Sequence, residues 1–163
     1  MKAVAVDLDG ALGDTRPLWR EFLADAARRY ASIAPLDVDG LPSDRGDAAV
    51  ALDEWASRGV GDWRSALARF AEERAPVFLR PNAEANAALR SLAAAGCKIG
   101  VFTDGPEELA RVALAHLGVA RQAEALETGA DARRRLRERL GQHAEIAASR
   151  DELVRLAAAS PTS

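Results

Sequence analysis

The sequence contains a single cysteine, Cys97, so the chain cannot form an internal disulfide bond. This favours a reducing compartment such as the cytoplasm, and the apolar sequence after Cys97 predicts a buried structural thiol. The two histidines, His116 and His143, are too few for a metal site built from several histidines. No apolar run approaches the roughly 20 residues of a membrane span, and Asp7 and Asp9 interrupt the region where a signal peptide needs its apolar core. We therefore expect a cytoplasmic protein without a membrane partner.

An excess of positive charge is also lacking. The chain has 22 Lys and Arg against 25 Asp and Glu, which gives a formal net charge of -3 and predicts no nucleic-acid partner. Hydrophobic residues make up 48% and charged residues 29%, a balance typical of globular proteins rather than disordered ones. The 163 residues suffice for one domain with a small insert. Composition leaves the oligomeric state open.

What is present is an alternation of strand and helix patterns. Apolar runs predict strands over residues 3–7, 97–103, 122–128 and 144–148. Helical spacing and capping residues predict helices over residues 17–31, 47–57, 62–75, 81–96, 106–118, 130–141 and 149–159. Residues 32–46, rich in Pro, Gly, Asp and Ser, predict a linker. The alternation predicts an α/β protein with a parallel sheet and helices on both faces.

Polar residues follow two of the predicted strands directly. The stretch VAVDLDG places Asp7, Asp9 and Gly10 at the end of the first strand, and VFTDG places Thr103 and Asp104 at the end of the second. In parallel sheets ligands bind beyond the carboxyl ends of the strands, so the two groups are expected to meet in one crevice. The alternatives are a solvated acidic turn for the first pair, a backbone-bound hydroxyl for Thr103, and helix capping for Asp104.

The run D7-L8-D9-G10-A11-L12-G13-D14-T15 resembles the first motif of the haloacid dehalogenase (HAD) superfamily, in its phosphatase-like branch. The run V101-F102-T103-D104-G105 resembles the second motif of that superfamily. The helical segment between them is similar to the small cap that many members insert at this point. The resemblance implies a Rossmann-like α/β core over residues 1–16 and 77–163, and a helical cap over residues 17–76.

The resemblance also implies a chemistry. Asp7 would attack a phosphoryl group and form an aspartyl-phosphate, and Asp9 would protonate the leaving oxygen and later activate water. Backbone N–H groups near Gly10, the hydroxyl of Thr103, and Asp104 would lie at the phosphate. A Mg²⁺ ion on Asp7 and Asp9 would offset the repulsion between carboxylate and phosphate. The implied function is a Mg²⁺-dependent phosphatase of a small phosphorylated metabolite.

The chain departs from the pattern of the family at its third motif, a lysine that holds the phosphate. Lys2 and Lys98 open strands, and so they lie at the wrong ends for the crevice. Arg133, Arg134 and Arg135 occupy about the right part of the chain, and we name Arg133 as the candidate phosphate ligand. The alternative is that ARRRLRERLG forms an amphipathic helix whose arginines lie in water.

The second departure concerns the fourth motif, which supplies acids that complete the Mg²⁺ site. The sequence AEIAASRDEL contains no match: Ser149 follows the predicted strand, and Glu152 has an alternative role in a capping box with Ser149. We interpret this segment as the last strand and helix of the fold, with the unit that carries the third and fourth motifs shortened or lost. Mg²⁺ would then bind weakly or be absent.

These departures keep a second hypothesis open, a catalytically impaired HAD-like domain with a binding or regulatory role. A third hypothesis is dehalogenation of a haloacid, which uses the same Asp7 without Mg²⁺. The accessory residues that this reaction usually needs are not recognisable in the sequence.

Overall fold

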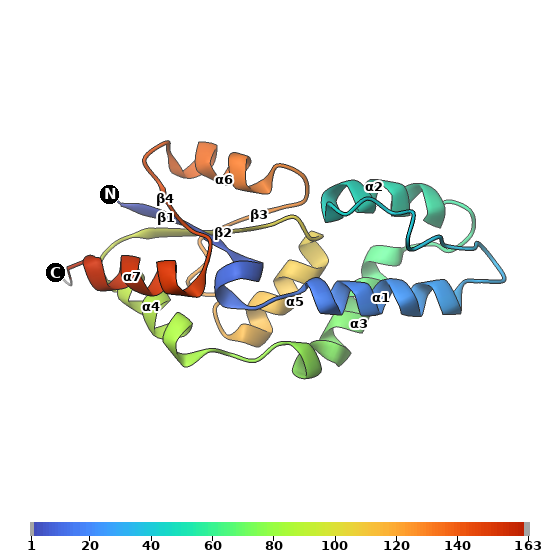
Figure 1. Ribbon diagram of the computed structural model, residues 1–163, viewed down its shortest axis with the longest axis horizontal. Coiled ribbons are helices and arrows are strands. Elements are labelled where there is room, and N and C mark those ends of the chain that lie inside the picture. The colour runs from blue at the N-terminus through green and yellow to red at the C-terminus, as the bar shows by residue number, and fades with distance from the viewer. Residues whose placement is uncertain (1, 162–163) are drawn as a thin grey trace.

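A computed structural model describes residues 2–161 of the chain (Figure 1). The strands form a four-stranded sheet in the order β3-β2-β1-β4, and every neighbouring pair is parallel. The strands are β1 (Ala3–Asp7), β2 (Lys98–Thr103), β3 (Ala125–Thr128) and β4 (Glu145–Ala147). The helices are α1 (Arg16–Arg29), α2 (Arg45–Ala56), α3 (Trp63–Phe78), α4 (Ala83–Ala94), α5 (Glu107–Leu117), α6 (Ala132–Leu140) and α7 (Arg150–Ala159). A π-helical turn, η1 (Leu8–Leu12), follows β1 directly.

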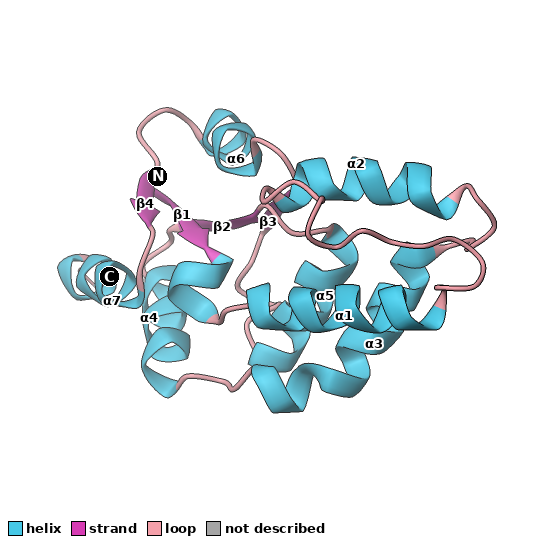
Figure 2. Cartoon of the chain, turned by 45° about the vertical axis from the view of Figure 1, so that its right-hand side comes forward, coloured by secondary structure: helices cyan, strands magenta, loops and turns pink. Residues whose placement is uncertain are grey.

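Helices cover both faces of the sheet, because successive side chains of each strand point to opposite faces. On one face Ala5 of β1 and Phe102 of β2 pack against Leu136 of α6. On the other face Val4 and Val6 of β1 belong to a much larger cluster with α4, α5 and α7. Figure 2 shows α6 alone above the sheet and these three helices below it. The predicted α/β fold with helices on both faces is confirmed.

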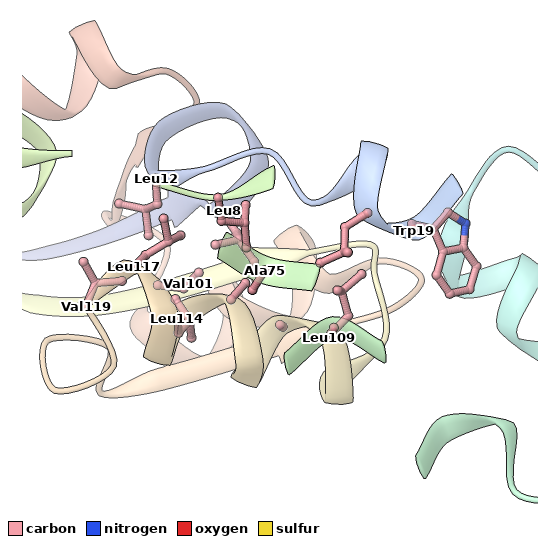
Figure 3. Packing of buried hydrophobic residues seen from close by; sticks show 14 of the residues in the cluster. Leu8, Leu12, Trp19, Ala75, Val101, Leu109, Leu114, Leu117 and Val119 are labelled. Atoms are coloured by element: carbon pink, nitrogen blue, oxygen red, sulfur yellow. The ribbon is translucent and has the colours of Figure 1, made fainter. Parts of the chain in front are cut away.

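The turn η1 is anchored in the larger cluster. Leu8 and Leu12 are buried, and they lie beside Leu117 of α5 and Val101 of β2 (Figure 3). These two leucines restrict the movement of the turn, because returning either buried side chain to water would cost about 2 kcal/mol. The polar residues between them are thereby held at the carboxyl end of β1.

The helices α1, α2 and α3 extend beyond the carboxyl ends of the strands (Figure 1). They share the larger apolar cluster with the sheet, and α3 packs along α5. Trp19 of α1 meets Trp63 of α3 edge to face, with ring centroids 6.2 Å apart. These helices occupy most of the predicted cap, residues 17–76, and the division into core and cap stays a prediction.

Most helix boundaries differ from the sequence-based prediction by one to three residues, and two of these differences have a clear physical reason. The helix α2 begins at Arg45 rather than at residue 47, because Asp44 caps it by accepting a hydrogen bond from the Asp47 N–H at 2.9 Å. The helix α3 continues through Pro76 to Phe78, where the Leu79 N–H still bonds to the Ala75 carbonyl. The first difference matters for the site, because it moves Arg45 from a linker onto a helix.

Within residues 2–161, no helix combines the length and the apolar character that a membrane crossing requires. Cys97 is buried, as predicted.

Candidate active site

Asp7 is the last residue of β1, and its carboxylate is oriented by the turn that follows. Its Oδ1 accepts hydrogen bonds from the backbone N–H groups of Asp9 at 3.1 Å and Gly10 at 3.3 Å. Within residues 2–161 no group donates to Oδ2, so that oxygen is free to react. Partial burial raises the pKa of Asp7 above its usual value, and the charge of Asp9 also raises it, against the lowering effect of the Gly10 N–H.

Gly10 lies where the loop after β4 comes closest to the turn. A Cβ atom at this position would lie 2.0 Å from the carbonyl oxygen of Ala148, so no side chain fits without a backbone shift. The Gly10 N–H is bonded to Asp7 rather than open to the pocket. Its expected role at the phosphate stays a prediction, and its observed role is to position the carboxylate.

Asp9 faces the same crevice, but both of its oxygens are occupied. Oδ1 accepts hydrogen bonds from the Thr15 N–H at 2.9 Å and the Thr15 hydroxyl at 2.6 Å. Oδ2 accepts hydrogen bonds from the Thr103 hydroxyl at 2.7 Å and from Arg45 Nη2 at 2.6 Å. The Asp9 side chain is only 10% exposed. These four donors fix the orientation of the Asp9 side chain in the crevice.

Arg45 is the residue that the sequence analysis missed. It is 3% exposed, and its guanidinium bonds to Asp9, to Asp104 through Nε at 3.0 Å and Nη2 at 2.8 Å, and to the hydroxyls of Thr15 and Thr103. Nη2 has two N–H groups and three acceptors in reach, so at least one bond is shared. Its partners are distant in the chain, so no local pattern relates this arginine to them. The one available signal was its place after the capping residue Asp44.

Thr103 and Asp104 end β2 beside the end of β1, as predicted. Thr103 is 2% exposed; its hydroxyl donates to Asp9 and accepts from the Gly105 N–H at 3.2 Å. Burial acts to raise the pKa of Asp104, but the hydrogen bonds and charge of Arg45 outweigh it and lower that pKa. Both residues therefore bond to protein groups in this structure, and their phosphate-binding role stays a prediction.

The crevice contains a pocket of about 460 Å³. Asp7 and Phe102 line it from the sheet, Arg16 from α1, and Asp131 and Arg133 from the start of α6. Arg133 is exposed. Its neighbours Arg134 and Arg135 are paired with Glu138 and Glu127, respectively. Among the three candidate arginines, only Arg133 lines this pocket.

The residues present do not fit a Mg²⁺ ion. Among residues 2–161, no three His, Cys, Asp or Glu side chains are grouped so that they could hold a metal. The strand β4 pairs directly with β1, so its end is the place from which further acids could reach Asp7. That end carries Ala148 and Ser149, and Glu152 instead accepts the Ala148 N–H at 2.7 Å while Ser149 caps α7. The chain therefore has a strand beside β1, but that strand does not end in the acids of the fourth motif.

The fold and the site define a class: a parallel α/β protein with an acidic crevice at the carboxyl ends of its two central strands. The chain belongs to the haloacid dehalogenase-like hydrolase family, whose model matches residues 1–149. A sequence comparison with curated proteins finds no match.

Two solved structures are similar to the chain. One is a candidate beta-phosphoglucomutase from Thermotoga maritima, 21% identical, with a TM-score of 0.53 over 97% of this chain and 82% of that one. The other is an L-2-haloacid dehalogenase from Xanthobacter autotrophicus with chloropropionic acid covalently bound, 17% identical, with a TM-score of 0.48 over 90% of this chain and 68% of that one. At this identity the first likeness supports the fold alone.

Proposed function

We propose that the protein is a phosphoric monoester hydrolase acting on a small phosphorylated metabolite. The observation that carries this proposal is Asp7 itself. Within residues 2–161, one oxygen is fixed by two backbone N–H groups and the other accepts no hydrogen bond, and Asp7 lines a pocket together with Arg16 and Arg133. An oriented carboxylate that shares a pocket with two arginines suits attack on an anionic centre.

The reaction would proceed in two displacements. Asp7 Oδ2 attacks phosphorus, the ester P–O bond breaks, and the leaving oxygen departs with the electron pair of that bond. Water then attacks the aspartyl-phosphate, which releases inorganic phosphate and restores the carboxylate. The raised pKa of Asp7 makes it a better nucleophile once it is ionised, and a smaller fraction of it is ionised at acid pH.

The state of Asp9 restricts the leaving group. Asp9 accepts four hydrogen bonds from protein groups in this structure, so neither of its carboxylate oxygens is free to bond to a leaving alkoxide. Acyl and aryl phosphates need no such proton, because their leaving groups are stable anions. We therefore expect these substrates to be hydrolysed faster than alkyl phosphates.

The test is phosphate release from acetyl phosphate, p-nitrophenyl phosphate and glycerol phosphate by the wild-type protein and Asp7→Asn. We expect turnover in the order acyl, aryl, alkyl, and a loss of at least about 1000-fold in Asp7→Asn. Asp25→Asn is the matched control, since Asp25 pairs with Arg28 and Arg29 on its own helix and does not line this pocket. Turnover that survives in Asp7→Asn would exclude Asp7 as the nucleophile.

The second candidate function is binding without turnover. The specific observation in its favour is the ion pairing of Asp9 and Asp104 with Arg45, together with the lack of acids at the end of β4. It predicts no phosphate release by the wild-type protein, and retained binding of inorganic phosphate by Asp7→Asn in calorimetry. The dehalogenase hypothesis is tested separately, by measuring chloride release from 2-chloropropionate.

A further inference from the structure

Carboxylates line the crevice from two segments of the chain. Asp7 and Asp9 flank the start of η1, and Asp104 follows β2, and all three line one pocket. Carboxylates that share one pocket repel one another, and partial burial strengthens this repulsion. A site of this kind needs a cation among the carboxylates before it can accept an anionic substrate.

Arg45 supplies a positive charge at that place. Its Nη2 lies 2.6 Å from Asp9 Oδ2 and 2.8 Å from Asp104 Oδ1, and it bridges the two loops. The backbone N–H of Arg45 also donates to Asp104 Oδ2 at 3.0 Å, so the first residue of α2 is bonded through both its backbone and its side chain. The positive charge is therefore carried by the first residue of α2, and bonds from both its backbone and its side chain fix its position.

The surrounding backbone is shaped around this arginine. A Cβ atom on Gly105 would lie 3.1 Å from the Arg45 Cζ, and one on Gly46 would lie 2.1 Å from the Ala130 nitrogen. Gly105 lets the loop after β2 approach the guanidinium, and Gly46 lets the start of α2 lie against the loop after β3. This packing is independent of the hydrogen bonds, and it indicates a built cation position rather than a chance ion pair.

We infer that Arg45 is the resident cation of this site and takes the place of a divalent metal ion. Both carboxylate oxygens of Asp9 accept hydrogen bonds and Asp104 is paired with Arg45, whereas within residues 2–161 no group donates to Asp7 Oδ2. The inference rests on the proposed function and deepens it. The hydrolase would accept an anionic substrate without Mg²⁺. Its central claim, that the site binds no divalent cation, is measurable without turnover.

The experiment measures Mg²⁺ binding directly. Thermal unfolding and calorimetry compare the wild-type protein, Arg45→Met and Arg45→Lys in EDTA and in millimolar MgCl₂, without substrate. We expect no change in the Tm of the wild-type protein. In Arg45→Met the carboxylates of Asp9 and Asp104 lose their cation, so MgCl₂ should raise the Tm by about 3 °C. Arg45→Lys keeps the charge and should stay unresponsive, which keeps the test valid if the methionine variant folds poorly.

Arg64→Met is the matched control. Arg64 also pairs with two acids, Asp53 and Glu108, but on the outside of α3. Its replacement should create no response to MgCl₂. A Tm increase in the wild-type protein or in Arg45→Lys, or no increase in a folded Arg45→Met, would overturn the inference.

The proposed function fails separately from this inference. Phosphate release that is absent, or that survives in Asp7→Asn, counts against the hydrolase proposal and leaves the Mg²⁺ measurements unaffected. Conversely, a wild-type hydrolase that Mg²⁺ activates at least about tenfold, with a matching Tm increase, would keep the hydrolase and remove Arg45 as its cation.

Discussion

At the scale of single residues, Asp7 and Asp9 show how environment separates two identical side chains. They are two positions apart, yet Asp7 keeps one oxygen open to the pocket while Asp9 accepts four hydrogen bonds. The difference arises from their partners: Asp7 meets only backbone N–H groups, whereas Asp9 meets Arg45 and two threonine hydroxyls. Asp7 is therefore arranged to react, whereas Asp9 connects the segments that form the crevice.

The raised pKa of Asp7 has a consequence for stability. A carboxyl group with a folded-state pKa above its unfolded value stabilises the folded state when it is protonated. That contribution is complete below about pH 3.8, the usual value, and is lost as the pH rises through the raised pKa. At neutral pH the ionised Asp7 is therefore unfavourable for folding.

Asp7→Asn should accordingly raise the Tm at pH 7 by roughly 1–3 °C, while activity is lost. The difference from the wild-type protein should shrink as the pH is lowered towards 4. Thermal unfolding followed by circular dichroism between pH 4 and pH 8 measures it. A variant less stable than the wild-type protein at pH 7 would contradict the account of Asp7.

At the scale of elements, α2 is the helix that completes the site. Its capping residue Asp44 sets where it begins, and its first residue, Arg45, enters the crevice. Gly46 lets the helix start lie against the loop after β3, because any larger residue would meet the Ala130 backbone. The position of one helix end thus decides whether the guanidinium reaches Asp9 and Asp104.

Gly46→Ala should displace this helix end. We expect a loss of about 1–3 kcal/mol in the free energy of unfolding, the usual range for overpacking, together with weaker binding of inorganic phosphate. Urea unfolding and calorimetry measure the two effects. Val50→Ala on the same helix is the control, because Val50 is 70% exposed and should change neither quantity. Equal behaviour of the two variants would show that the helix end does not need the glycine.

At the scale of the whole molecule, the apolar core is continuous across the predicted boundary between core and cap. Leu18, Leu52 and Leu67 of the three insert helices belong to the same buried cluster as Ile99 of β2 and Leu92 of α4. The helix α3 joins the two parts, because it packs along α5 as well as against α1 and α2. The insert thus depends on the sheet layer for much of its burial.

We therefore expect a single cooperative thermal transition. Differential scanning calorimetry should give one peak whose calorimetric enthalpy equals its van't Hoff enthalpy. Two peaks, or a proteolytic fragment of residues 17–76 that stays folded, would show instead that the cap is an independent unit.

The local features of the chain could be predicted from the sequence. Strand and helix order, the capping role of Ser149, and the burial of Cys97 follow from short-range patterns that the structure confirms. The convergence of Asp7 and Asp9 with Thr103 also followed, because parallel strands end at one edge of a sheet. These properties depend on residues near one another in the chain or on a general rule of topology.

The tertiary structure alone decided which residues neutralise the site. Arg45 lies 36 residues from Asp9 and 59 from Asp104, and no local pattern relates the three. The free oxygen of Asp7, the occupied oxygens of Asp9 and the closeness of Ala148 to Gly10 likewise depend on contacts between distant segments. The amino-acid order determined which elements form and where their polar ends lie. Which charges meet, and therefore what the crevice can bind, was determined by packing, because electrostatic interactions act through space and not along the chain.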